Sequence, residues 1–154
     1  MDLSCSEVIH NFLHNRMFMM SEAQRTMMRT HGVLVGRVLL GLLFLVAGYN
    51  KLTGDGGVSG FAGMLTNMNI PAAMLVAWVV VLIEIVGGAM LILGYRVGLA
   101  AGVLSVFLLL TVLLVHNPMK DASQMTQALK NLSILGGLLY AIAYGPGQGW
   151  KVTK

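Results

Sequence analysis

Long apolar runs separated by short polar or glycine-rich breaks dominate this sequence. Four runs read as membrane-spanning helices and cover residues 33–51, 72–93, 97–116 and 125–144. A helix needs about 20 apolar residues to cross about 30 Å of hydrocarbon. The last run is purely apolar only over residues 132–144, so it must extend back through Asn131 and Lys130, whose long side chain then reaches the interface. The pattern predicts an all-α integral membrane protein, a four-helix bundle with short loops.

The breaks between the runs carry turn chemistry. The segments Gly54–Gly57 and Gly94–Arg96 follow the first and second runs, and Gly145-Pro146-Gly147 stops the fourth. Pro71 is placed to open the second run. Between the first two runs, apolar residues recur at helical spacing, which predicts a short amphipathic helix on the membrane surface. These residues are Phe61, Met64, Leu65 and Met68.

We divide the chain into an N-terminal extension (1–30), a four-helix transmembrane domain (31–147) and a short cytoplasmic tail (148–154). The extension has no apolar core and no small-residue cleavage site, so it does not read as a signal peptide. Two readings of it stay open. It is a short interfacial helix, or translation starts at Met19 or Met20 and the preceding stretch is not part of the protein.

The distribution of Lys and Arg predicts the orientation. Seven of these residues lie on the N-terminal side of the threaded helices, namely Arg16, Arg25, Arg29, Arg37, Arg96, Lys151 and Lys154. Three lie on the opposite side, namely Lys51, Lys120 and Lys130. Because cytoplasmic loops carry the excess of positive charge, we expect a multi-pass protein of a bacterial-type inner membrane with both termini cytoplasmic.

Composition excludes several classes of protein. Hydrophobic residues make up 56% of the 154 residues and charged residues only 10%, against about 25% charged in soluble domains. The net charge of +4 comes from residues scattered at the ends of apolar runs, so we expect no nucleic acid partner. A single cysteine, Cys5, allows no internal disulfide or iron–sulfur cluster. His10 and His14 have no third ligand, so no metal site is predicted, and no cofactor is expected to be held by this chain alone.

Glu84 is the most informative polar residue because it lies near the middle of the second run. A carboxylate at that depth costs about 2.5–3.5 kcal/mol unless it is paired, protonated or used. Arg37 lies about two helical turns away in depth and is the first candidate counter-ion, with Lys51 or Asn131 next. Threading the helices also brings Lys51, His116 and Asn131 to one level on the non-cytoplasmic side.

These positions outline a polar pocket above Glu84. Glu84 and His116 are its candidate catalytic residues, and Lys51, His116 and Asn131 its candidate ligand-binding residues, suited to a quinone headgroup. The simpler readings stay open as well. Lysines extend to the interface, asparagines cap helices or bond between them, and His116 ends a helix.

Small residues recur every four positions at Gly94, Gly98 and Gly102. In lipid, such a face lets helix backbones approach closely. It serves either packing within the bundle or the formation of a homo-oligomer.

Five segments carry a resemblance to a known family, in this order: GRVLLGLLFLVAGYNKL, GFAGMLTNMNIP, VVLIEIVGGAMLILGYR, LLVHN and KNLSILGGLLYAIAYGPG. Together they resemble the DoxX family of small four-helix membrane proteins, from about Gly36 to Gly147. The resemblance implies recurrent positions at Arg37, Gly48, Lys51, Glu84, Gly94, His116, Asn131 and the Gly145-Pro146-Gly147 stop. It also implies an inner-membrane bundle, linked in some members to thiosulfate:quinone oxidoreduction or to membrane oxidoreductase complexes. The lone Cys5 lies outside the pattern.

Three functions are compatible with these observations. The chain is a membrane subunit or anchor of a quinone-linked or thiol/sulfur oxidoreductase, docking a redox partner that brings the cofactor. Alternatively, it is a non-catalytic assembly or scaffolding protein whose polar core sets helix register. A third reading is a small-molecule or proton transporter, for which four short helices leave little room without oligomerisation.

Overall fold

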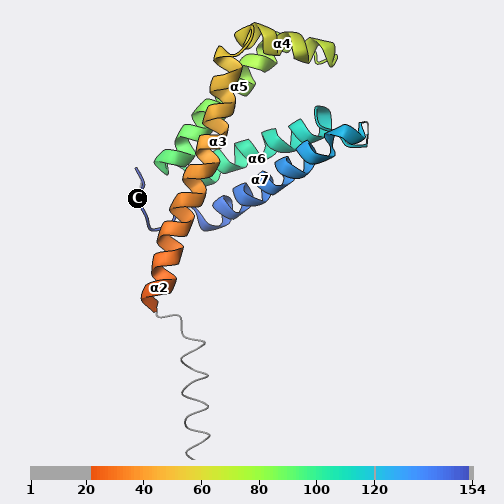
Figure 1. The fold of residues 1–154 in the computed structure, drawn as a ribbon. Helices are drawn as coiled ribbons and strands as arrows, with labels where there is room; N and C mark the ends of the chain where they lie inside the picture. The colour runs from red at the N-terminus through yellow and green to blue at the C-terminus, as the bar shows by residue number, and fades with distance from the viewer. Residues whose placement is uncertain (1–21, 120, 153–154) are drawn as a thin grey trace, which may run out of the picture.

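The computed structural model describes residues 22–119 and 121–152, and these are almost entirely helical (Figure 1). The element order is α2 (Glu22–Met27), a π-helical turn η1 (Met28–Gly32), α3 (Val33–Thr53), α4 (Gly57–Asn67), α5 (Ala73–Leu93), α6 (Val97–Leu114), a 3₁₀ turn η2 (Ala122–Gln124) and α7 (Met125–Tyr144). No strand occurs among the described residues, which confirms the all-α prediction. The prediction for residues 1–21 lies outside the described part of the chain.

Three helices in the described residues are long and apolar enough to cross a membrane: Thr30–Thr53, Ala73–Leu93 and Val97–Leu114. The fourth predicted span is present as α7, a 20-residue helix. Its first half carries Thr126, Gln127, Lys130, Asn131 and Ser133, which lower its hydropathy below that of the other three helices. The structure therefore supports a helical membrane protein, and the count of four spans is not confirmed.

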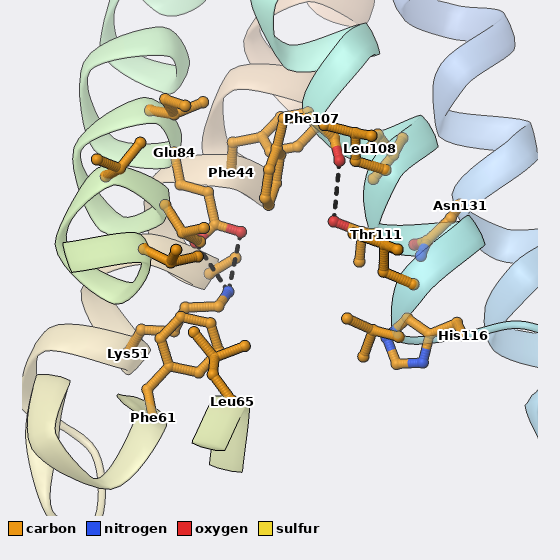
Figure 2. Close-up of a pocket in the computed structure, with 18 of the residues that line it drawn as sticks. Phe44, Lys51, Phe61, Leu65, Glu84, Phe107, Leu108, Thr111, His116 and Asn131 are labelled. Carbon is orange, nitrogen blue, oxygen red and sulfur yellow. Dashed lines mark hydrogen bonds and ion pairs between the residues drawn. The ribbon is translucent and has the colours of Figure 1, made fainter. Parts of the chain in front are cut away.

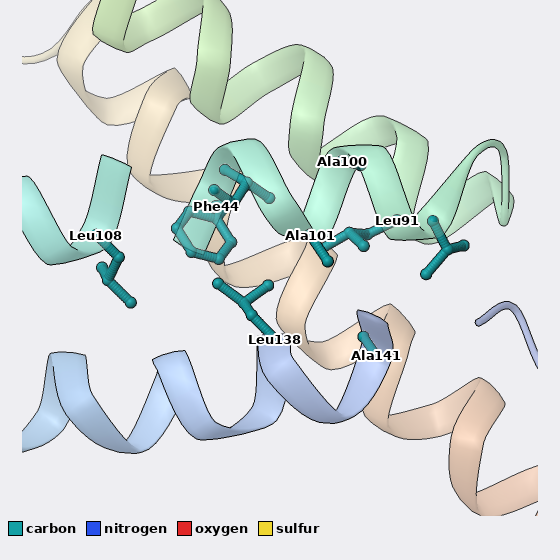
Figure 3. Close-up of a cluster of buried hydrophobic side chains, with 9 residues drawn as sticks. Phe44, Leu91, Ala100, Ala101, Leu108, Leu138 and Ala141 are labelled. Carbon is teal, nitrogen blue, oxygen red and sulfur yellow. The ribbon is translucent and has the colours of Figure 1, made fainter. Parts of the chain in front are cut away.

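The helices associate as two pairs. α3 packs along α5, and α6 packs along α7. The pairs converge at the end where the α5–α6 turn lies and diverge toward the end where α4 lies (Figure 1). Buried apolar side chains from all four helices fill the convergence, among them Phe44, Leu91 and Leu138 (Figure 3). These three side chains and Leu104 are almost fully buried. On the α4 side, a cavity lies between the two pairs and is lined by residues of both.

Close backbone contact between α3 and α5 rests on glycine. A Cβ added to Gly41 would lie 2.7 Å from the carbonyl oxygen of Gly88, and one added to Gly88 would lie 2.8 Å from the amide nitrogen of Leu45. No side chain fits at either position, so these glycines permit the approach of the two helices.

The predicted packing role of the Gly94, Gly98 and Gly102 face is wrong within this chain. A Cβ at Gly98 or Gly102 would meet nothing within 4 Å. Gly94 instead forms the turn between α5 and α6, with a φ of 70° that favours glycine. Sequence spacing alone does not show which helix faces meet, which is why the repeat was misleading.

The amphipathic helix predicted between the first two spans is α4. Val58, Ala62 and Leu65 are buried against Ala77 and Val81 of α5. The prediction that Pro71 opens the second span is wrong by two residues, because Ala72 takes a left-handed conformation and α5 begins at Ala73.

Candidate functional site

Lys51 and Glu84 form an ion pair between α3 and α5. The ammonium nitrogen of Lys51 lies 2.9 Å from Oε1 and 2.8 Å from Oε2 of Glu84. The Lys51 side chain is 26% exposed and the Glu84 side chain only 5%. Gly48, one turn before Lys51, lets α3 approach this part of α5, since an added Cβ would lie 3.0 Å from the Cβ of Glu84. The pair therefore neutralises the carboxylate that the second span carries at depth.

The predicted pairing of Arg37 with Glu84 is wrong. Arg37 is 2% exposed, but its guanidinium donates to three backbone carbonyls, those of Pro146 (2.9 Å), Trp150 (2.7 Å) and Ile92 (3.4 Å). The chain after α7 folds back over the end of α5, where the amide of Val152 also donates to the carbonyl of Leu93 at 3.0 Å. The fork of the guanidinium suits several carbonyls at once, so Arg37 anchors the C-terminal segment.

The Phe61 ring of α4 lies beside the ion pair of Lys51 and Glu84. The ammonium of Lys51 lies 5.5 Å from the centroid of the Phe61 ring, close enough for a cation–π interaction. Phe61, Met64, Leu65 and Met68, the predicted apolar face of α4, all line the adjoining cavity. That face therefore serves the cavity as well as the packing against α5.

The opposite wall belongs to the α6–α7 pair (Figure 2). His116 follows the end of α6, and its Nδ1 lies 2.9 Å from Oε1 of Gln124. Asn131 on α7 is only 7% exposed, yet its side chain makes no hydrogen bond with any described residue. Thr111 on α6 donates back to the carbonyl of Phe107. The amide of Asn131 lines the cavity, where a ligand can form a hydrogen bond with it.

One cavity of about 1020 Å³ joins the two walls, with Lys51 and Glu84 on one side and His116 and Asn131 on the other (Figure 2). Most of its lining is apolar and includes Leu43, Phe44, Val79, Ile83, Val103, Val106, Phe107, Leu110 and Ile134. Val106 and Leu110 line the cavity and are also 62% and 50% exposed on the surface of the molecule. The cavity therefore opens sideways, at the level of the apolar helices.

The DoxX family model matches residues 32–117, which run from the start of the first spanning helix to just beyond His116. The chain is also 35% identical over 116 residues to "Inner membrane protein YqjF" of Escherichia coli (strain K12), covering 75% of this chain and 85% of that protein. The chain belongs to the DoxX family. No solved structure matches it.

The family match covers part of the site in this DoxX protein. Lys51, Glu84 and His116 lie inside the matched residues, whereas Gln124 and Asn131 lie beyond them on the α7 side. One cavity is lined by Lys51, His116 and Asn131 together with Glu84, as expected from the position of each residue along its apolar run. Their role in binding or catalysis is a separate matter and stays a prediction.

Two residues of the site were missed from the sequence. Phe61 was read only as part of an amphipathic face, and Gln124 was not considered. The sequence holds a signal for Gln124, because this residue lies eight residues after His116, across a short loop and just before the next helix. Among residues 22–119 and 121–152, no three His, Cys, Asp or Glu side chains gather as a metal site would require.

Proposed function

We propose that this DoxX-family membrane protein binds the headgroup of a quinone-type lipid in the cavity between its two helix pairs, as the membrane subunit of a quinone-linked oxidoreductase system. The observation that supports this most is Asn131, a largely buried residue that lines a large apolar cavity and whose amide has no hydrogen-bond partner among the described residues. Ligand sites of this kind are mostly apolar with a few placed polar groups.

The residues of the cavity suit such a ligand. A quinone needs an apolar slot for its tail and hydrogen-bonding groups near its carbonyl oxygens. Asn131 and the ammonium of Lys51 are donors on opposite walls (Figure 2). The exposed lining residues Val106 and Leu110 would let a lipid tail enter from the bilayer. A bound quinone would supply two-electron redox chemistry, and the electrons would come from a partner subunit that holds its own cofactor.

The same proposal includes the orientation of the chain. We take α7 as a fourth span, since 20 residues at about 1.5 Å rise reach about 30 Å. Tyr140 and Tyr144 stack near the end of α7, and both are exposed, as are Tyr95 in the α5–α6 turn and Trp150 in the C-terminal segment. Exposed aromatic side chains collect at membrane interfaces, and this end would face the cytoplasm.

Binding of a short-chain ubiquinone to the purified protein in lipid nanodiscs tests this proposal. We expect saturable binding that Asn131→Leu weakens about tenfold, the effect of losing one hydrogen bond in a buried site. Ser133→Leu is the matched control because Ser133 is exposed on the same helix and bonds only to the carbonyl of Leu129. Absence of saturable binding would contradict the proposal and favour the scaffolding role. Solute flux in proteoliposomes without quinone binding would favour a transporter.

A further inference from the structure

A chain of three polar side chains leads from the cavity to the surface. His116 lines the cavity, and its Nδ1 lies 2.9 Å from Oε1 of Gln124. Nε2 of Gln124 lies 3.5 Å from Oδ2 of Asp121, which is fully exposed. Asp121 also accepts from the hydroxyl of Ser123 at 2.8 Å and from its backbone amide at 2.9 Å. The hydroxyl of Ser123, then its amide, hold the pKa of Asp121 below the ordinary value.

The donor and the acceptor of each hydrogen bond follow from the carboxylate of Asp121, at the exposed end of this series of side chains. An ionised carboxylate only accepts, so the amide nitrogen of Gln124 must face Asp121, and its carbonyl oxygen must face His116. A carbonyl oxygen also only accepts, so Nδ1 of His116 must carry a proton. In the neutral ring, the other nitrogen, Nε2, then bears a lone pair and only accepts. No described residue bonds to Nε2, which leaves it for a ligand.

We infer that neutral His116 makes this site select the hydroxyl-bearing, reduced form of the ligand, a quinol over a quinone. This inference rests on the proposed function. A quinol hydroxyl donates to Nε2, whereas a quinone carbonyl there meets a lone pair. Gln124 and Asp121 act as positioning residues, because they set the tautomer of His116 without touching the ligand.

The described charged groups that share the cavity are Lys51 and Glu84 on the facing wall and Lys130 on α7. Lys51 and Glu84 neutralise each other as an ion pair. Nε2 of neutral His116 is therefore the group on this wall that distinguishes a ligand hydroxyl from a ligand carbonyl.

Two measurements on the intact protein test the inference. The first is the ¹⁵N NMR spectrum of the histidine rings, with the His116 signals assigned from His116→Asn. We expect the Nδ1-protonated tautomer. His31 is an internal reference, because its Nδ1 lies 3.0 Å from the carbonyl oxygen of Met27 and must also be protonated in a neutral ring. An Nε2-protonated neutral His116 would overturn the inference.

The second measurement compares the binding of short-chain ubiquinol and ubiquinone under anaerobic conditions. We expect the quinol to bind about tenfold more tightly than the quinone, the effect of one hydrogen bond in a buried site. Gln124→Leu should remove this ratio, whereas Gln127→Leu, at an exposed position of α7, should keep it. Equal binding of both forms by the wild-type protein would overturn this inference alone. Binding of neither would overturn the proposed function and this inference with it.

Discussion

Lys51 and Glu84 are paired across the α3–α5 interface, with the ammonium nitrogen 2.9 and 2.8 Å from the two carboxylate oxygens. Because both oxygens face the same nitrogen, a single cation from the last turn of α3 compensates the carboxylate in the middle of α5. The pair forms one wall of the cavity, so it links the stability of the bundle to the polarity of the site.

Breaking this pair from one side should be costly. We expect Lys51→Met or Glu84→Gln to lower the free energy of unfolding by about 3 kcal/mol, the lower end for buried pairs because Lys51 is 26% exposed. The double variant should cost less than the sum of the two, since neither group is left unpaired. A double-mutant cycle from unfolding in detergent checks this, and strictly additive costs would show that the pair contributes no coupling.

The glycine contact between α3 and α5 gives a second prediction. Gly88→Ala places a methyl group 2.7 Å from the carbonyl oxygen of Gly41, and we expect it to lower stability by about 1–3 kcal/mol through overpacking. Gly136→Ala is the matched control, because nothing lies within 4 Å of its added Cβ. That change should be neutral or stabilise α7 by up to about 1 kcal/mol. Equal thermal unfolding of both variants would contradict the packing described above.

The anchoring of the C-terminal segment by Arg37 is tested by Arg37→Lys. A lysine keeps the charge but cannot bond to the carbonyls of Pro146 and Trp150 with a planar fork. We expect protease cleavage beside Lys151 to become about tenfold faster, the effect of losing one hydrogen bond to a charged group. Arg96→Lys, at an exposed turn, should cleave at the wild-type rate. Unchanged cleavage of Arg37→Lys would mean that other contacts hold the segment.

Much of this arrangement could be predicted from how far along its apolar run each polar residue lies. The runs predicted α3, α5 and α6, and alternating direction placed Lys51, His116 and Asn131 at one level, where the structure brings them to one cavity. The depth of a charged residue in the membrane does not determine which group it pairs with. Arg37 was expected to reach Glu84, but the fold-back of the C-terminal segment, which has no periodic signal, supplies carbonyls that are nearer to Arg37.

The sequence also did not show which residues far apart along the chain come into contact. The repeat of Gly94, Gly98 and Gly102 predicted a packing face, yet the close approach uses Gly41 and Gly88, which belong to no such repeat. The role of Gln124 depends on how the loop after α6 turns back, and its spacing of eight residues from His116 does not by itself determine that turn.

The number of spans is decided by reporter fusions after Lys154 and in the loop at Asp121. If α7 crosses the membrane, the two fusions report opposite sides, and the charge distribution predicts the C-terminal one to be cytoplasmic. If α7 lies on the surface, both fusions report the same side. The second result would contradict the four-span orientation and leave three spans, those of α3, α5 and α6.

Photo-cross-linking with a photoreactive quinone analogue tests the central claim most directly, because it locates a ligand by residue in the membrane-embedded protein. We expect adducts on Met64 of α4 or on Met68 just after it, on the end of α6 near Thr111 and on α7 near Asn131, and excess unlabelled quinone should compete for them. Adducts confined to outward-facing positions such as Leu75 and Leu99, without competition, would contradict a binding site in this cavity.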